Sequence, residues 1–230
     1  MSRSQQLLKD CADAFASSKD CRFIIEATDG HLDDQVWRAY MENELSFVCT
    51  VHHLMKQLIA GAPKQRHAAW DGIIANLHDD QVPYLAGLLD VPVRQAMHAE
   101  THDVLSQYLT RTVQTGGYPA FAASMFAAEN LYQQWCYQAW QGSRTVMPPA
   151  LRQWVGMHVN DEFHQSVLFW NESLDEIDER IQNKTLVNWS SSMLETERQF
   201  HESSYRTHAS GFIDDKNIEE KDVDEKKVEA

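Results

Sequence analysis

Residues 121–140 read FAASMFAAENLYQQWCYQAW, and this segment is the most apolar long helical pattern in the chain. Small and apolar residues fall on nearly every side of a helix drawn through it, which is typical of a helix buried all round. We therefore expect a central helix from Pro119 to about residue 141. Glu129 interrupts the apolar pattern. It shares one helical face with three residues of the kind that fill cores: Met125, Tyr132 and Cys136.

Two further long helices repeat this placement of an acid on an apolar face. The clearer one is expected to begin at Leu32-Asp33-Asp34 and to end at Gly61 and Pro63. Its apolar residues recur at steps of three and four: Trp37, Tyr40, Phe47, Val51, Leu54 and Leu58. Glu44 lies inside this series. The last helix, expected from about 185 to 208, places Glu197 between Met193 and Phe200 in the same way.

Shorter or less regular helical patterns occupy most of the remaining chain. They cover residues 4–28, 64–79, 80–89, 92–114, 150–169 and 172–183. Glycine (9) and proline (6) are scarce, and no strand pattern or internal repeat is evident. We therefore expect an all-α bundle of seven to eight helices, forming a single domain over residues 1–210. Residues 211–230 are rich in lysine and acid and are expected to be a disordered, solvating tail.

Composition narrows the range of partners and compartments. The formal net charge of −14 argues against nucleic acid or an anionic membrane as a partner, since either would repel an acidic surface. The four cysteines show no CxxC spacing, which suits a reducing compartment. The sequence shows neither a signal-peptide pattern nor an apolar run long enough to span a membrane. We therefore expect a soluble, cytoplasmic protein.

The three acids on apolar faces are the strongest functional signal. Any one of Glu44, Glu129 and Glu197 could lie at the edge of its helical face or reach out to water. If their three helices surround one cavity, however, the carboxylates converge there. Carboxylates that share a site of low dielectric constant cannot all ionise, so their pKa values separate and supply an acid and a base together. Aromatic neighbours would line such a cavity with flat walls suited to a planar ring: Tyr40, Phe47, Tyr132 and Phe200.

A metal site is the alternative reading of the same residues. Carboxylate-bridged di-iron sites in helical bundles take Glu, Asp and His ligands from several helices. Five residues at suitable spacings could form one: Asp71, His78, Glu129, His158 and Glu162. The next inward position is Gln165, which is a poor ligand, so the set is incomplete and both readings stay open. Cys136 is expected to be a buried structural thiol.

Four segments, in this order and spacing, resemble the TenA/thiaminase-II family, which has the heme-oxygenase-like all-helical fold. They are YMENELSFV (40–48), SQYLTRTVQTGGYPAFAASMFAAENLYQQW (106–135), LRQWVGMHVNDEF (151–163) and ETERQF (195–200). The resemblance covers most of residues 20–208. It implies a homo-oligomer, a dimer or tetramer, that acts in thiamin salvage. Members of the family hydrolyse aminopyrimidine breakdown products of thiamin, or thiamin itself, to hydroxymethylpyrimidine.

Matched position by position, the resemblance assigns roles and also shows departures. The family's catalytic glutamate, three residues before a phenylalanine, corresponds to Glu197, and the tryptophan that usually follows that phenylalanine is His201 here. Glu44 replaces a pyrimidine-binding aspartate. The cysteine that stands four residues before Tyr132 in the common branch is Ala128, and Glu129 follows it directly. That change resembles the family's second branch, in which a glutamate stands in for the missing thiol.

The sequence thus predicts a hydrolase that acts on aminomethylpyrimidine or its N-formyl derivative without a metal or other cofactor. Glu197, Glu129 and Tyr132 are the expected catalytic residues. The expected substrate contacts are Glu44, Phe47, Tyr40, Phe200 and His158, the last of which corresponds to a ring-contacting tyrosine of the family. Two alternatives remain: a di-iron oxidase of the same fold, and a protein that binds a pyrimidine or another metabolite without turnover.

Overall fold

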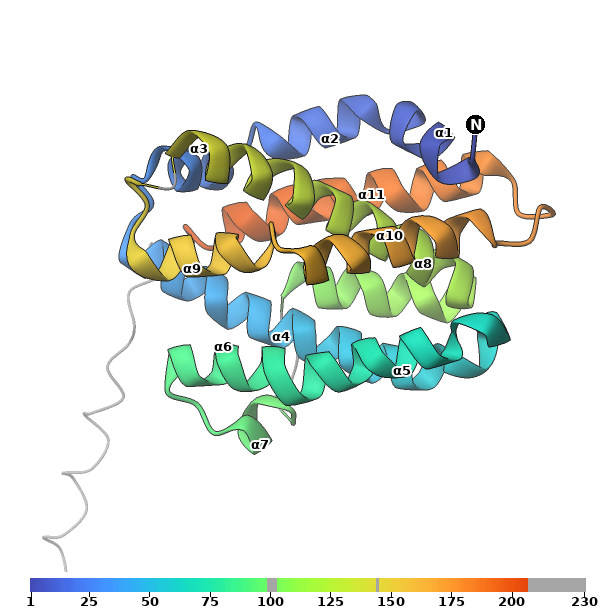
Figure 1. Ribbon diagram of the computed structural model, residues 1–230, viewed down its shortest axis with the longest axis horizontal. Helices are drawn as coiled ribbons and strands as arrows, with labels where there is room; N and C mark the ends of the chain where they lie inside the picture. Colours follow the sequence, from blue (N-terminus) through green and yellow to red (C-terminus); the bar gives the residue numbers. More distant parts are fainter. Residues whose placement is uncertain (99–102, 144, 207–230) are drawn as a thin grey trace, which may run out of the picture.

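Helices joined by short connections make up the computed structural model, which describes residues 1–98, 103–143 and 145–206. These residues contain no β-strand, and the expected tail at 211–230 lies outside them. Figure 1 shows the arrangement. The α-helices are α1 (Arg3–Asp10), α2 (Ala12–Lys19), α3 (Arg22–Asp29), α4 (Asp34–Leu58), α5 (His67–Asn76), α6 (Val82–Leu89), α7 (Val93–Ala96), α8 (Val104–Ser143), α9 (Pro149–Met157), α10 (Asp161–Asp175) and α11 (Asn183–Ser203).

The second half of α8 is the centre of the bundle, as the sequence predicts. Nearly every residue from Tyr118 to Leu131 is buried. The helix is kinked at Gly117, whose φ of 58° and ψ of −147° lie outside the helical region and favour glycine. A side chain at Gly116 would come within 2.7 Å of the Trp189 ring, so α11 can approach α8 closely at this point.

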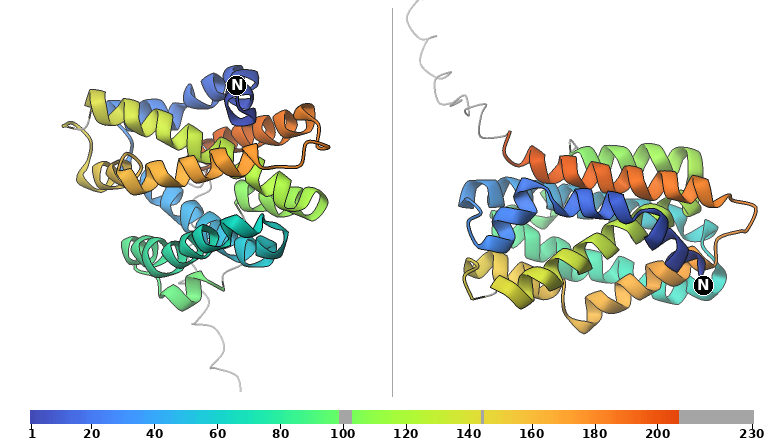
Figure 2. Two further views of the ribbon diagram at one scale, coloured as in Figure 1. Left: turned by 45° about the vertical axis from the view of Figure 1, so that its right-hand side comes forward. Right: turned by 90° about the horizontal axis from the view of Figure 1, so that it is seen from above.

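Three long helices pack against one another around the core. The most extensive helix contact is between α11 and α8, and α11 also lies along α2, as the view from above in Figure 2 shows. On the other side, α4 contacts α8, and α5 and α6 form one row against α4 (Figure 1). Because Glu44, Glu129 and Glu197 each belong to one of these three helices, the packing brings the acids to the same region.

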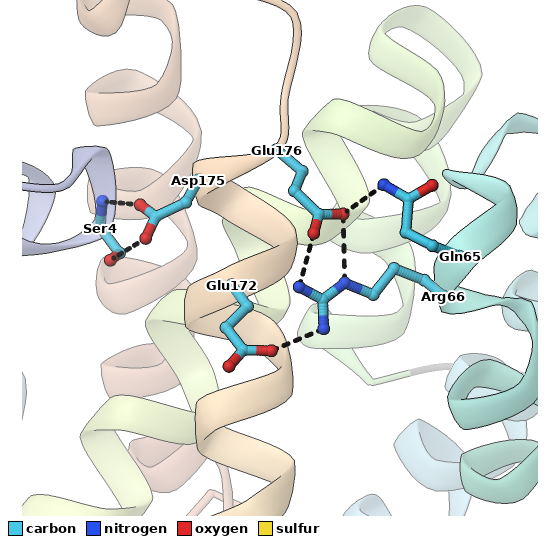
Figure 3. Close-up of polar contacts among 6 residues, drawn as sticks. All are labelled: Ser4, Gln65, Arg66, Glu172, Asp175 and Glu176. Atoms are coloured by element: carbon cyan, nitrogen blue, oxygen red, sulfur yellow. Dashed lines mark hydrogen bonds and ion pairs between the residues drawn. The ribbon is translucent and has the colours of Figure 1, made fainter.

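The C-terminal half of α10 joins two distant parts of the chain (Figure 3). The backbone N–H and the hydroxyl of Ser4 in α1 donate to the Asp175 carboxylate at 2.6 and 3.1 Å. On the other side, Arg66 before α5 donates to Glu172 at 2.6 Å and to Glu176 at 2.6 and 3.1 Å. These contacts stabilise α10 between α1 and α5.

Two expected helices are broken where a side chain caps a new one. The helix predicted over 92–114 is wrong as a single unit, since α7 ends at Ala96 and α8 begins after Asp103, which accepts from the Ser106 N–H at 2.7 Å. The helix predicted over 150–169 divides in the same way. Asn160 accepts from the Phe163 N–H at 2.7 Å and begins α10 there.

Other boundaries differ for local reasons, although the all-α architecture is confirmed. Residues 64–66 form a 3₁₀ turn before α5, and a π-helical turn, Leu77–Gln81, joins α5 to α6. The pattern at 172–183 is not one helix, because α10 continues to Asp175 and α11 begins only at Asn183. The described residues therefore divide into more helical pieces than the seven to eight expected. None of these helices is both long and apolar enough to cross a membrane.

Candidate active site

Three carboxylates from three helices meet in the core. Glu197 of α11 is fully buried, Glu44 of α4 is 8% exposed, and Glu129 of α8 is partly buried. The electrostatic influence of Glu44 reaches both of the others, and Glu129 also acts on Glu197. The convergence that the apolar faces predict is therefore present in the structure.

These carboxylates are only partly satisfied. Within the described residues, no hydrogen-bond partner reaches Oε2 of Glu44, Oε2 of Glu129 or Oε1 of Glu197. All three oxygens are buried, and a buried acid that lacks partners favours its neutral form. Such a cluster can hold protons at pH 7, where ordinary glutamates hold almost none.

The pKa values of all three acids are raised, as their burial requires. Burial, with the charge of Glu44 as a second cause, raises the pKa of Glu129 to about 8. Burial also raises the pKa of Glu44 to about 7, against the opposing effect of the Tyr40 hydroxyl. For Glu197, burial and then Glu44 hold the pKa well above its usual range. Near pH 7 the cluster therefore combines protonated and ionised carboxyl groups, as acid–base chemistry requires.

Two tyrosines connect the cluster by hydrogen bonds. The Tyr132 hydroxyl donates to Oε2 of Glu197 at 3.4 Å, and the Tyr40 and Tyr132 hydroxyls lie 2.9 Å apart. A phenol has one proton, so Tyr132 can donate to Glu197 only if Tyr40 donates to Tyr132. Burial raises the pKa of both phenols, which keeps them protonated. The hydroxyls of Tyr40 and Tyr132 thus link Glu197 to Glu44, and because Tyr40 has one proton it can donate either to Tyr132 or to Glu44 but not to both.

Aromatic rings pack around this chain, including the four that the sequence proposes as walls. Phe200 lies edge-on to Tyr40 at 5.6 Å between ring centroids and 6.3 Å from Phe47. Trp154 of α9, which the sequence did not single out, lies 5.6 Å from Tyr40 and 5.7 Å from Tyr132. The only sign of Trp154 in the sequence was its place on the apolar face of an amphipathic helix.

His201 stands where the family usually has a tryptophan, and the structure explains this departure. It stacks on Tyr40 with a centroid distance of 5.5 Å and an interplanar angle of 7°, and it is fully buried. Burial lowers its pKa to about 3, so the ring is neutral at physiological pH. It therefore occupies the position of a flat apolar side chain without adding a charge beside Glu197.

His158 lies between the cluster and the surface. It follows α9, and its Nδ1 lies 2.8 Å from the Trp154 carbonyl oxygen. Its ring is 5.5 Å from Tyr132, and burial lowers its pKa to about 4. His158 also lines a pocket of about 670 Å³ between α8 and the α9–α10 connection. Neither this pocket nor a second one of about 400 Å³ near α3 is lined by the three acids.

The di-iron ligand set is not brought together. Asp71, His78 and Glu162 are exposed, and His78 bonds instead to Asp79 at 2.7 Å. Glu129, by contrast, faces the core with the other two acids. In the part of the chain that the structure describes, no three His, Cys, Asp or Glu side chains are arranged to hold a metal ion. The five proposed ligands fail because helical spacing alone could not fix which face of each helix turns inward.

One acid beside the cluster was missed. Asp103 is buried, accepts from the Ser46 hydroxyl at 2.7 Å, and raises the pKa of both Glu44 and Glu197. Its signal in the sequence was that of a helix N-cap, which the expectation of a continuous helix concealed. Cys136 is buried, and burial raises its pKa well above the usual range, which fits the structural thiol expected there.

The helices in this order form a heme-oxygenase-like bundle, the fold that the sequence resemblance predicts. Heme oxygenase-1 from the cyanobacterium Synechocystis, in complex with heme, is similar over 91% of this chain and 96% of its own, with a TM-score of 0.57 and 11% identity. More similar are TenA homologues. One from P. horikoshii matches over 90% of this chain and 99% of its own, with a TM-score of 0.78 and 14% identity.

A putative TenA-like thiaminase from Sulfolobus solfataricus also matches, over 88% of this chain and 95% of its own, with a TM-score of 0.71 and 15% identity. No protein-family model and no curated protein matches the chain. At these identities the likeness shows the fold, and the chain therefore has the fold of TenA homologues over nearly its whole described length.

Proposed function

We propose that this protein is an aminopyrimidine hydrolase that converts aminomethylpyrimidine, or its N-formyl derivative, to hydroxymethylpyrimidine. The observation that carries the proposal is the cluster of Glu44, Glu129 and Glu197, three buried carboxyl groups with unpartnered oxygens on three helices. Such groups destabilise a fold, so their convergence indicates use. The TenA-like fold and the likeness to the TenA-like thiaminase from Sulfolobus solfataricus support the same class of reaction.

Each acid takes a separate part in the proposed reaction. Glu44 accepts from the ring amino group and bonds a ring nitrogen, which fixes the orientation of the pyrimidine. Glu129 in its ionised form, which its pKa of about 8 makes the minor form at pH 7, takes a proton from water, and the water oxygen forms a bond to the exocyclic methylene carbon. The bond from that carbon to nitrogen breaks, and Glu197 gives the leaving nitrogen its proton. The Tyr132 hydroxyl, bonded to Glu197 in this structure, orients the acid for that transfer.

The substrate ring is proposed to lie among Phe47, Tyr132 and the neighbouring aromatic side chains, entering from the pocket beside His158. Ala128 stands where the common branch of the family has its cysteine, and burial raises the pKa of the nearby Cys136 thiol well above its usual range, which makes Cys136 a poor nucleophile. Glu129, one residue further on, supplies a base in place of that nucleophile. Thiamin itself is therefore proposed to be a poor substrate.

An end-point assay tests the proposal. Purified protein is incubated with aminomethylpyrimidine, its N-formyl derivative or thiamin, with and without a chelator, beside Glu129→Gln and Glu197→Gln. We expect release of hydroxymethylpyrimidine that is insensitive to chelator and lost in both variants. Thermal stabilisation by a pyrimidine without any release of product would contradict catalysis and favour a binding protein. Stoichiometric iron in the preparation together with no turnover would favour the oxidase.

A further inference from the structure

The tautomer of His158 is fixed by its surroundings. Its Nδ1 lies 2.8 Å from the carbonyl oxygen of Trp154, and a carbonyl can only accept, so Nδ1 carries the proton. In a neutral imidazole the other nitrogen, Nε2, then carries the lone pair. Burial lowers the pKa of this ring to about 4, so Nε2 stays an acceptor throughout the physiological range.

The ring is also held in place by aromatic neighbours. The centroid of His158 lies 4.0 Å from that of Trp154, 4.7 Å from Phe163 and 5.5 Å from Tyr132. Packing of this kind restricts the rotamer, so the acceptor keeps one position. Tyr132 in turn bonds Glu197, which places His158 two contacts away from the acid that is proposed to protonate the leaving nitrogen.

The pocket outside His158 offers room for the part of the substrate beyond the pyrimidine. Its volume of about 670 Å³ is in the range of ligand sites. Polar side chains from α8 and from the start of α10 line it beside His158: Gln133, Gln134, Asn160, Asp161 and His164. Tyr132 contacts both residues, since its hydroxyl bonds Glu197 and its ring centroid lies 5.5 Å from that of His158, so a leaving group beside Tyr132 is near both.

We infer that His158 Nε2 accepts a hydrogen bond from an N–H on the leaving group, and so selects substrates whose exocyclic nitrogen carries hydrogen. This inference rests on the proposed function. An amino or formylamino substituent has such a hydrogen, whereas the quaternary nitrogen that joins the two rings of thiamin has none. A substrate without the N–H leaves the lone pair of Nε2 buried against it and unpartnered, which costs binding energy. His158 is thus a specificity-determining residue for the leaving group.

A structural role for His158, as a cap on the end of α9, predicts something different. Its loss would then lower stability and would slow all substrates by a similar factor. Discrimination between two substrates that differ in a single N–H separates the roles, because global destabilisation affects both substrates equally. The test therefore compares ratios of kcat/KM within one variant.

The probes are N-formyl-aminomethylpyrimidine and its N-methyl derivative, in which a methyl group replaces the amide hydrogen. Wild-type protein, His158→Phe and His158→Gln are compared. We expect wild type to prefer the N–H substrate by about tenfold or more in kcat/KM. The preference should fall to near one in His158→Phe, which keeps a ring but has no acceptor. His158→Gln, whose amide oxygen restores an acceptor, should recover part of it.

Binding of 4-amino-2,5-dimethylpyrimidine, which has no exocyclic nitrogen on its methyl group, is measured by calorimetry as a control. All three proteins should bind it, and the ratios of kcat/KM are compared only among proteins that do. An unchanged preference in His158→Phe, with this control bound and substrate turned over, overturns the inference and leaves the proposed function standing. If wild type neither binds the control nor turns over either formamide, the proposed function fails and the inference fails with it.

Discussion

Two groups of acids in this molecule lie in opposite environments. At the surface, Glu172 of α10 and Glu176, which directly follows α10, both bind Arg66, with N–O distances of 2.6 Å (Figure 3). In the core, the charge of Glu44 acts on both Glu129 and Glu197, and each of the three acids has an oxygen that no partner reaches within the described residues. The surface acids are paired with the positive charge of Arg66. The core acids lie instead among groups that carry the same charge when ionised.

The surface contacts stabilise the fold, whereas the core acids are the candidate catalytic groups. The Arg66 contacts join α5 to α10, and they raise the pKa of the arginine, as expected for a paired ion. The core acids do nothing comparable, since burial raises their pKa values and makes each ionised form unfavourable. Removing a charge from the surface group should therefore lower stability and leave activity unchanged. Removing an acid from the core group should maintain or raise stability and reduce activity.

The largest effect is expected from Glu197→Gln. The amide keeps the size of the side chain but cannot give up a proton, so turnover of the N-formyl aminopyrimidine should fall by about 10² to 10⁴-fold. Stability should be unchanged or increased, because a neutral group replaces one that burial disfavours when charged. Steady-state kinetics and thermal melting of the same preparation measure both quantities.

Glu172→Gln is the matched control for this change, since it also converts a glutamate to an amide but lies far from the cluster on α10. Its turnover should equal that of wild type. A rate loss confined to Glu197→Gln supports the assignment. Equal rates in wild type and Glu197→Gln, with substrate bound, would remove Glu197 from the chemistry and leave its burial without a functional explanation.

The second prediction concerns the pH dependence of stability. The acids have pKa values of about 7 for Glu44 and about 8 for Glu129, against an ordinary value of 4.5. Above pH 4.5 the folded state therefore binds more protons than the unfolded chain, and the contribution of these groups to stability is lost as pH rises through 7 and 8. His158 and His201, with pKa values of about 4 and 3, act oppositely and lose stability as pH falls below 6.5.

The two effects oppose one another between about pH 4.5 and 6.5, so stability should be greatest in that interval and should decline toward pH 8 and below pH 4.5. Glu129→Gln should remove part of the alkaline decline, raising Tm at pH 8 by about 2–4 °C for each kcal/mol gained while changing it little at pH 5. Thermal melts across this range provide the curves. A Glu129→Gln curve parallel to that of wild type would show that this carboxyl group is ionised in the folded protein at neutral pH.

The third prediction concerns the loss of the arginine that pairs with the surface acids. Arg66→Met keeps much of the apolar stem but removes the charge shared by Glu172 and Glu176. Because the Arg66 side chain is only 17% exposed and bonds two carboxylates, the free energy of unfolding should fall by about 1–2 kcal/mol. Urea denaturation measures this value. Turnover at 25 °C should not change, and a matching loss of activity would mean that α10 transmits strain to His158.

The sequence predicted the inner faces of long helices better than the breaks between them. The placement of Glu44, Glu129 and Glu197 followed from apolar residues at steps of three and four, because burial along a long helix imposes that period. The breaks before α8 and α10 were missed, since Asp103 and Asn160 act as caps through single hydrogen bonds that a short apolar pattern does not reveal.

The partners of these acids could be predicted less well than their burial. Nothing in the sequence showed that the Tyr40 and Tyr132 hydroxyls would lie 2.9 Å apart, or that Trp154 would pack against both rings. Such contacts depend on the rotation of one helix about its axis relative to another. The same uncertainty produced the di-iron alternative, in which Asp71 and His78 were placed inward although both are exposed.

The smallest predicted effect lies within the surface group. Glu176 accepts two hydrogen bonds from Arg66 and one from Gln65, and its side chain is 30% exposed, whereas Glu172 accepts one from Arg66 and is 58% exposed. Exposure lets water and salt screen the attraction, so Glu176→Gln should cost about 1 kcal/mol and Glu172→Gln less.

The salt dependence of stability tests the difference between Glu176→Gln and Glu172→Gln. The difference between the two variants, measured by urea denaturation, should shrink when the ionic strength is raised from 0.05 to about 1 M, because screening weakens both pairs. The Tm gain of Glu129→Gln at pH 8 should persist, since the core carboxylates are shielded from ions. If salt removed both differences equally, the core acids would have to be in contact with solvent, and the distinction between the two groups would fail.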